Sequence, residues 1–158
     1  MSRILFIGVG NPYRSDDGVG VAAIELLRQA GMGGVDLVEE SGEPVALVQR
    51  WSGRSKVFLI DAVDSGGEPG ALHRFECIDG QWDAAPPASA VSTHGIGVAE
   101  AVELARVLER LPAHLVLYGI EVGDVRNGVG LSPPVAEALE TLVDDLVAAA
   151  GAGSEQAR

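Results

Sequence analysis

The stretch GVGNPYRSDDGVG, from Gly8 to Gly20, decides how the fold is interpreted. An apolar run enters this glycine-rich turn, and an apolar run with helical spacing leaves it, which is the pattern of a strand, a turn and a helix. A phosphate-binding loop would offer bare backbone amides or a lysine here, but this turn carries the adjacent carboxylates of Asp16 and Asp17. The pattern therefore predicts a parallel α/β unit whose ligand is not a phosphate.

The same alternation of strand-like and helix-like runs continues along the chain. The expected strands are Arg3–Val9, Val35–Glu40, Lys56–Val63, Ala71–Glu76 and His114–Val122. The expected helices are Gly18–Ala30, Glu43–Trp51, Thr93–Arg110 and Ser132–Ala150. This order predicts an α/β fold, a single three-layer αβα sandwich with a mostly parallel twisted sheet of about five strands and helices on both faces. We expect one domain over residues 1–150 and a flexible tail over residues 151–158.

Composition and charge exclude several classes of partner. The chain has 158 residues, of which 47% are hydrophobic, and a net charge of −12, which would repel the phosphate backbone of a nucleic acid. The single cysteine, Cys77, rules out an internal disulfide and is typical of a reducing cytoplasm. No apolar run reaches the roughly 20 residues of a membrane span, and the N-terminal run is too short for a signal peptide. We therefore expect a cytoplasmic monomer with no membrane partner.

The candidate site residues follow the expected strands, because ligands of parallel α/β sheets bind beyond the carboxyl ends of the strands. Asp17 follows the first strand, and Asp61 ends the third, where a carboxylate after an apolar run must be paired, hydrogen-bonded or bound to a metal. Asp16 or Asp17 could instead simply cap the first helix, without binding a ligand. His94, taken alone, is most simply an ordinary residue at the start of a helix. Together, Asp17, Asp61 and His94 form a set of two carboxylates and one imidazole that suits a borderline divalent metal.

Several common catalytic motifs are absent from the sequence. The dinucleotide-binding fingerprint fails at Tyr13, where its third glycine would stand. No Walker loop, Gly-x-Ser-x-Gly elbow or His-Glu-x-x-His motif is present. Cys77 has no histidine motif near it and is interpreted as structural. The carboxylate–histidine set is the chemistry that remains.

Five blocks occur in a specific order: GVGNPYRSDDGVG, IDAV, STHGIG, YGIEVGD and GLSPPVAEAL. Over residues from Ile4 to about Val147 the chain resembles the hydrogenase maturation endopeptidases, which process the large subunit of nickel–iron hydrogenases. The resemblance implies a twisted sheet between helices and removal of a C-terminal extension from the large-subunit precursor after nickel insertion. It places the family's metal-contacting and catalytic residues on Asp17, Asp61 and His94, with aspartate at a loop position that is glutamate in some members.

The resemblance also implies the cofactor and partner. No organic cofactor is expected; the nickel is carried by the substrate, or another divalent metal binds the isolated protein, and Asp17 is alternatively a general base. Asn11, Asp16, Gly42 and Glu43 are the candidate substrate-binding residues. Two other functions stay open at this point: a metal-dependent chaperone or sensor that binds the hydrogenase precursor without cutting it, and a small-molecule hydrolase.

Overall fold

The fold was analysed in a computed structural model that describes residues 3–84 and 97–156. Its strands are β1 Ile4–Val9, β2 Asp36–Glu40, β3 Lys56–Val63, β4 Leu72–Ile78, β5 Gln81–Trp82 and β6 His114–Glu121. Its helices are η1 Ser15–Gly18, α1 Val19–Gln29, α2 Pro44–Trp51, α3 Gly97–Val107 and α4 Pro133–Gln156. None of the helices in these two ranges combines the length and apolar character needed to cross a membrane.

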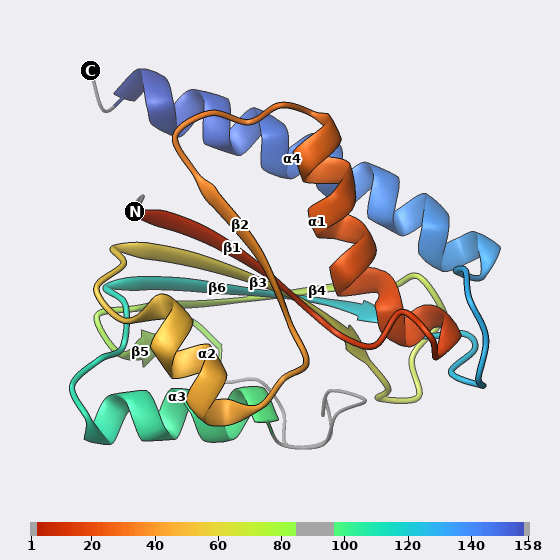
Figure 1. The fold of residues 1–158 in the computed structure, drawn as a ribbon, viewed down its shortest axis with the longest axis horizontal. Helices are drawn as coiled ribbons and strands as arrows, with labels where there is room; N and C mark the ends of the chain where they lie inside the picture. The colour runs from red at the N-terminus through yellow and green to blue at the C-terminus, as the bar shows by residue number, and fades with distance from the viewer. Residues whose placement is uncertain (1–2, 85–96, 157–158) are drawn as a thin grey trace.

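The six strands form one sheet in the order β2-β1-β3-β6-β4-β5 (Figure 1). Strands β2, β1, β3 and β6 run parallel, whereas β4 is antiparallel to β6 and β5 is antiparallel to β4. The mostly parallel sheet is therefore confirmed, with one strand more than expected. The parallel strands place their carboxyl ends at one edge of the sheet, which is the right-hand edge in Figure 1.

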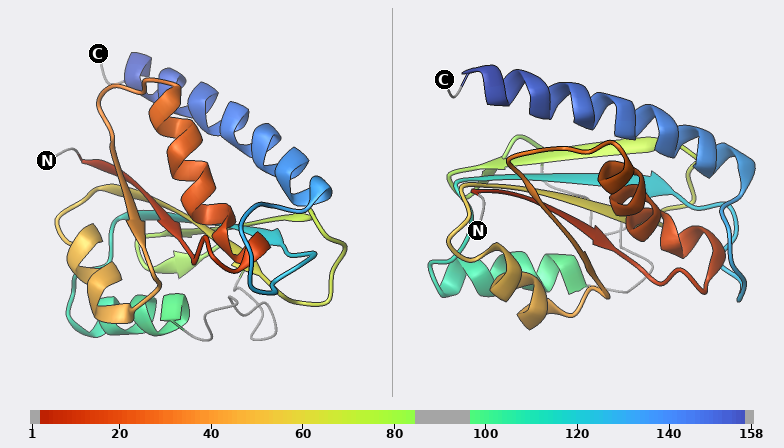
Figure 2. Two further views of the ribbon diagram at one scale, coloured as in Figure 1. Left: turned by 45° about the vertical axis from the view of Figure 1, so that its right-hand side comes forward. Right: turned by 45° about the horizontal axis from the view of Figure 1, so that its top comes forward.

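Helices cover both faces of the sheet, which confirms the three-layer arrangement (Figure 2). Successive side chains of a strand point to opposite faces, so Phe58, Ile60 and Ala62 of β3 pack in one core cluster with residues of α1 and α4. Val57 and Leu59 pack in the second cluster, with residues of α2 and α3. By the same alternation, Asp61 lies on the face covered by α2 and α3.

Glycines allow the start of α1 to lie directly against the sheet. A Cβ atom on Gly20 would lie 2.4 Å from the carbonyl oxygens of both Val9 and Ile60. A Cβ atom on Gly8 would lie 2.1 Å from the carbonyl oxygen of Gly20. Gly8 and Gly20 therefore allow the backbone of α1 to pack directly against the strands, because neither carries a Cβ. This packing places the turn between β1 and α1 beside the end of β3.

Three segments differ from the sequence-based expectation. Strand β4 extends to Ile78, and the turn at Asp79 and Gly80, with φ of 49° and 81°, leads into the short strand β5. Two residues with positive φ are what a tight hairpin turn requires, and Asp-Gly is a strong signal for it. Helix α3 ends at Val107, three residues before the expected end at Arg110, and its expected start at Thr93 lies outside the described residues. Helix α4 continues to Gln156, through most of the segment expected to be a tail.

Candidate active site

Asp17 lies in η1, the single turn of helix between β1 and α1. Its side chain is fully buried, and η1 is in contact with β3. The backbone of this turn is closed by hydrogen bonds from Asp17 N to Arg14 O at 3.1 Å and from Asn11 N to Asp17 O at 3.3 Å. Asp17 is therefore held at the carboxyl edge of the sheet, between the ends of β1 and β3.

Asp61 lies near the carboxyl end of β3 and is 2% exposed. One carboxylate oxygen accepts a hydrogen bond from the backbone N–H of Ala62 at 2.8 Å. In the sheet, Asp61 is opposite Gly119 of β6, which has no side chain, and Gly119 is in turn opposite His73 of β4. Paired positions share a face, so the row from β3 to β4 places Asp61 and His73 on the face covered by α2 and α3.

Two of the three predicted metal ligands can be placed, and both lie at the same edge of the sheet. Asp17 and Asp61 are buried on elements that follow or end the neighbouring strands β1 and β3. His94 lies outside the described residues. Within residues 3–84 and 97–156, no three histidine, cysteine, aspartate or glutamate side chains form a group that could hold a metal ion. The described residues thus supply two carboxylates of the predicted set.

Asp16 has a different environment from its neighbour. Its buried carboxylate accepts hydrogen bonds from Gly123 N, Asp124 N, Ser132 N and Ser132 Oγ, each at 2.7 Å. These donors lie after β6 and at the start of α4, far from Asp16 in sequence. A carboxylate with this many donors is satisfied inside the protein, so Asp16 joins the glycine-rich turn to the loop between β6 and α4.

The other three candidate substrate-binding residues lie at the same edge of the sheet but make local contacts. Asn11 Oδ1 accepts a hydrogen bond from Tyr13 N at 2.9 Å, which shapes the turn after β1. Glu43 is the N-cap of α2, and its carboxylate accepts from Val45 N and Ala46 N at 3.1 and 3.0 Å. Gly42, buried and with φ of 102°, joins β2 to this cap.

A buried carboxylate to which the sequence assigned no role lies at the end of β6. Glu121 is 1% exposed and accepts hydrogen bonds from Ser65 N at 3.2 Å, from Ser65 Oγ, and from His73 Nε2 at 2.9 Å. Burial alone would raise the pKa of Glu121, but the hydrogen bonds from Ser65 and His73 outweigh burial and lower it. Glu121 is therefore a carboxylate that ties the loop after β3 to β4 and β6, one strand away from Asp61. The signal in the sequence was only its position at a strand end.

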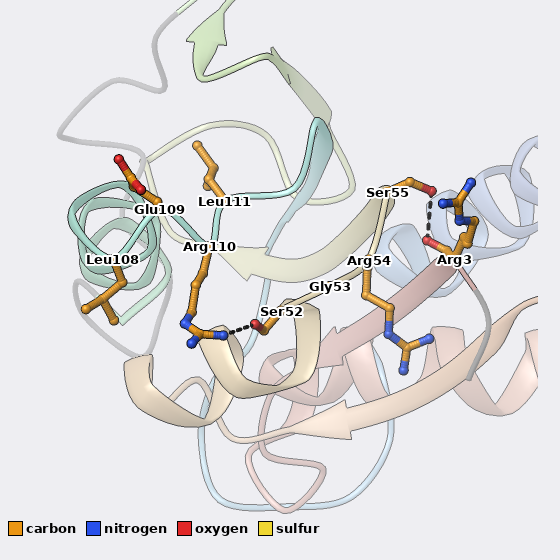
Figure 3. A pocket seen from close by; sticks show the side chains of 9 residues that line it. All are labelled: Arg3, Ser52, Gly53, Arg54, Ser55, Leu108, Glu109, Arg110 and Leu111. Atoms are coloured by element: carbon orange, nitrogen blue, oxygen red, sulfur yellow. Dashed lines mark hydrogen bonds between the residues drawn. The ribbon is translucent and has the colours of Figure 1, made fainter.

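A pocket of about 620 Å³ lies at the opposite edge of the sheet. Its lining comes from the start of β1, the loop between α2 and β3, and the segment after α3 (Figure 3). Arg3, Arg54 and Arg110 contribute side chains, but their guanidinium groups point in different directions rather than toward one centre (Figure 3). Neither Asp17 nor Asp61 lines this pocket, so the candidate site is defined by the carboxyl edge of the sheet.

Known protein sequences resemble this chain over nearly its full length. The profile of the HycI family, described as hydrogenase maturation protease, matches residues 21–149. The chain is 32% identical over 146 residues to the hydrogenase expression/formation protein HupD of Bradyrhizobium diazoefficiens, covering 90% of this chain and 75% of that protein. It is 26% identical over 153 residues to the hydrogenase 2 maturation protease of Escherichia coli, covering 93% and 90% of the two chains.

Solved structures show the same fold. The hydrogenase maturating endopeptidase HybD from E. coli superposes with a TM-score of 0.77 at 25% identity, covering 94% of this chain and 91% of that one. The nickel–iron hydrogenase maturation protease HycI from Thermococcus kodakarensis gives a TM-score of 0.69 at 26% identity, covering 92% and 90%. The likeness therefore includes both the sheet and the helices that position Asp17 and Asp61.

The family match decides between the functions that the sequence left open. The match supports a protease that acts during hydrogenase maturation, rather than a non-proteolytic chaperone or sensor or a small-molecule hydrolase. Its reaction is cleavage of the C-terminus of the large-subunit precursor of a nickel–iron hydrogenase. The chain therefore belongs to the HycI family and is a hydrogenase maturation endopeptidase.

Proposed function

We propose that Asp17, Asp61 and His94 together bind the nickel ion that the precursor carries, so that the enzyme cuts only metal-loaded substrate. The observation that supports this proposal is the burial of two carboxylates at the ends of neighbouring strands, with exposures of 0% for Asp17 and 2% for Asp61. Holding two carboxylates in a buried site is costly unless a cation or donors compensate their charge. A divalent cation delivered by the substrate would stabilise two carboxylates held at neighbouring strand ends further, beyond the contacts they make within the protein.

The donor set also fits the chemistry of the ion. Two carboxylate oxygens and one imidazole nitrogen suit a borderline metal and leave coordination positions for ligands from the precursor. Asp17 and Asp61 lie on different elements of one chain, so a single copy supplies both carboxylates. No organic cofactor takes part in this scheme, and the metal is part of the substrate.

Hydrolysis adds water across the scissile peptide bond: the water oxygen bonds to the carbonyl carbon, the C–N bond breaks, and a proton passes to the leaving nitrogen. An ionised carboxylate next to the carbonyl can accept the proton of the attacking water. Two roles for Asp17 therefore fit this position, metal ligand and general base. In the first role Asp17 contributes to precursor binding, and in the second it contributes to the rate of cleavage.

The test uses nickel-loaded and nickel-free precursor with the variants Asp17→Asn, Asp61→Asn and His94→Ala. Processing is followed by the size shift of the precursor on a gel, and precursor binding is measured separately. We expect each variant to lose processing by at least about 100-fold. Loss of the affinity difference between loaded and free precursor identifies a ligand, whereas loss of cleavage with that difference intact identifies a base.

Asp64→Asn is the matched control, because Asp64 is an exposed aspartate just after the same strand. It should process the precursor at the wild-type rate. Processing at the wild-type rate by both Asp17→Asn and Asp61→Asn would overturn the proposal, even if the wild-type enzyme is confirmed as a protease.

A further inference from the structure

Strand β4 brings a histidine to the edge of the sheet at which Asp17 and Asp61 lie. Because β4 runs antiparallel to β6, it begins at the carboxyl edge of the parallel strands, at the right of Figure 1. His73 is the second residue of β4. Its side chain is 33% exposed, so solvent and a bound polypeptide can reach the imidazole.

The register of the sheet places His73 two strands away from Asp61, on the same face. Asp61 is opposite Gly119 of β6, and Gly119 is opposite His73. Adjacent strands are about 4.8 Å apart, so the Cα atoms of Asp61 and His73 are roughly 10 Å apart. Gly119 places no side chain between them. A methyl group of Val63 covers this position instead, because a Cβ atom on Gly119 would lie 2.5 Å from Val63 Cγ2.

The imidazole and the Asp61 carboxylate thus flank an apolar strip of the sheet. Side chains that stand parallel on one face keep about the spacing of their Cα atoms. In inverting glycosidases, the acid and the base that act on one bond with a water molecule between them are about 6.5–9.5 Å apart. The spacing across the strip therefore suits two groups that act on the two sides of one scissile bond.

Glu121 holds the imidazole from the buried side. His73 Nε2 lies 2.9 Å from Glu121 Oε1, and an ionised carboxylate only accepts hydrogen bonds, so Nε2 carries a proton. Nδ1 makes no hydrogen bond to the residues that the structure describes. A carboxylate placed in this way fixes the orientation of the ring and stabilises the imidazolium, as the aspartate of serine proteases does. Nδ1 is the nitrogen left for proton transfer.

We propose that His73 is the general acid of the cleavage reaction. Water adds to the carbonyl carbon and gives a proton to a carboxylate. The C–N bond then breaks, its electron pair stays on nitrogen, and the proton of His73 Nδ1 passes to that nitrogen. The exposed imidazole regains a proton from solvent. This inference rests on the protease function and on cleavage at this edge of the sheet, and it supplies the proton that the leaving nitrogen needs.

The test compares His73→Gln with the wild-type enzyme at several concentrations of nickel-loaded precursor. The glutamine amide can still donate a hydrogen bond to Glu121, but it does not act as an acid. We expect kcat to fall by at least about 100-fold, with KM and the midpoint of urea unfolding close to the wild-type values. The affinity difference between nickel-loaded and nickel-free precursor should persist, because His73 does not bind the metal.

A precursor with an ester in place of the scissile amide tests the role of the acid directly. An alkoxide leaves far more readily than an unprotonated amide nitrogen, so cleavage of the ester depends less on a proton donor. His73→Gln should therefore cut the ester at close to the wild-type rate, although it cuts the amide slowly.

His114→Gln is the matched control. His114 also pairs with a carboxylate through Nε2, at 2.5 Å from Glu76 Oε2, and its side chain is 27% exposed. It is the first residue of β6 and lies at the opposite edge of the sheet. The kcat of this variant should equal that of the wild type.

Four results would overturn the proposal for His73. They are a wild-type kcat for His73→Gln, an equal loss of rate on the amide and the ester, an equal loss of kcat in His114→Gln, and a rise in KM with kcat unchanged. The last result would assign His73 to precursor binding. Wild-type processing by Asp17→Asn and Asp61→Asn would refute the metal site without changing the result for His73, so the two proposals fail separately.

Discussion

Replacing Asp16 with alanine should destabilise the protein more than most single substitutions. The substitution removes a carboxylate that accepts four hydrogen bonds, three from backbone N–H groups and one from a hydroxyl, all at 2.7 Å and fully buried. A hydrogen bond to a charged group contributes about 1.5–3 kcal/mol to folding. The sum for four such bonds, about 6–12 kcal/mol, is an upper bound, because bonds to one group are not additive and water can reach the freed donors.

We expect the free energy of unfolding to fall by about 3–5 kcal/mol for Asp16→Ala, in line with the removal of one partner from a buried charged network. Asp16→Asn should cost less. If the amide oxygen of the new asparagine takes the place of Oδ2, it can still accept hydrogen bonds from Gly123 N, Asp124 N and Ser132 Oγ. The amide NH2 then takes the place of Oδ1 and faces the backbone N–H of Ser132, so only that hydrogen bond is lost. Equilibrium unfolding in urea measures both values.

Asp124→Ala is the control for this prediction, because the Asp124 carboxylate bonds to the nearby Arg126 and not across the loops. Its unfolding midpoint should match the wild type. The reasoning would be refuted if Asp16→Ala lowered the free energy of unfolding by less than about 1 kcal/mol, a typical value for any substitution. Loss of Asp16 should also reduce precursor processing, since the turn that carries Asp17 would no longer be anchored.

Two further predictions concern stability. Gly20→Ala should lower the free energy of unfolding in urea by about 3 kcal/mol, because the new Cβ would meet the carbonyl oxygens of Val9 and Ile60. Gly33→Ala is the control and should leave the stability unchanged, because nothing lies within 4 Å of a Cβ at Gly33. An unchanged stability of Gly20→Ala would contradict the close packing of α1 against the strands. The hydrogen bonds to Glu121 lower its pKa in the folded state, so its contribution to stability is present at neutral pH and lost as pH falls below about 4. Glu121→Gln should therefore be less stable than the wild type at pH 7, and the difference in unfolding free energy should shrink as the pH falls below about 4. A difference that stays constant over that range would count against this role.

Secondary structure was largely predictable because it depends on short-range patterns. The apolar run Lys56–Val63 was expected as a strand and forms β3 with the same bounds. The expected helix Gly18–Ala30 corresponds to α1, Val19–Gln29. Strand β5 was missed, although Asp79 and Gly80 form the turn that their dipeptide favours, because the two-residue strand after them is too short to show alternation.

The sequence by itself determined the α/β class, the parallel core of the sheet and the edge at which Asp17 and Asp61 lie. Those features depend on residue type and spacing within a few positions, and on the rule that parallel strands end at one edge. Only the tertiary structure showed that Asp16, whose chemistry is identical to that of Asp17, joins the glycine-rich turn to the loop between β6 and α4. The partners of Asp16 are donors more than 100 positions away in the chain, and which distant groups meet is decided by the packing of the whole molecule. The same holds for Gly20, where helix propensity favours alanine and the adjacent strands exclude it.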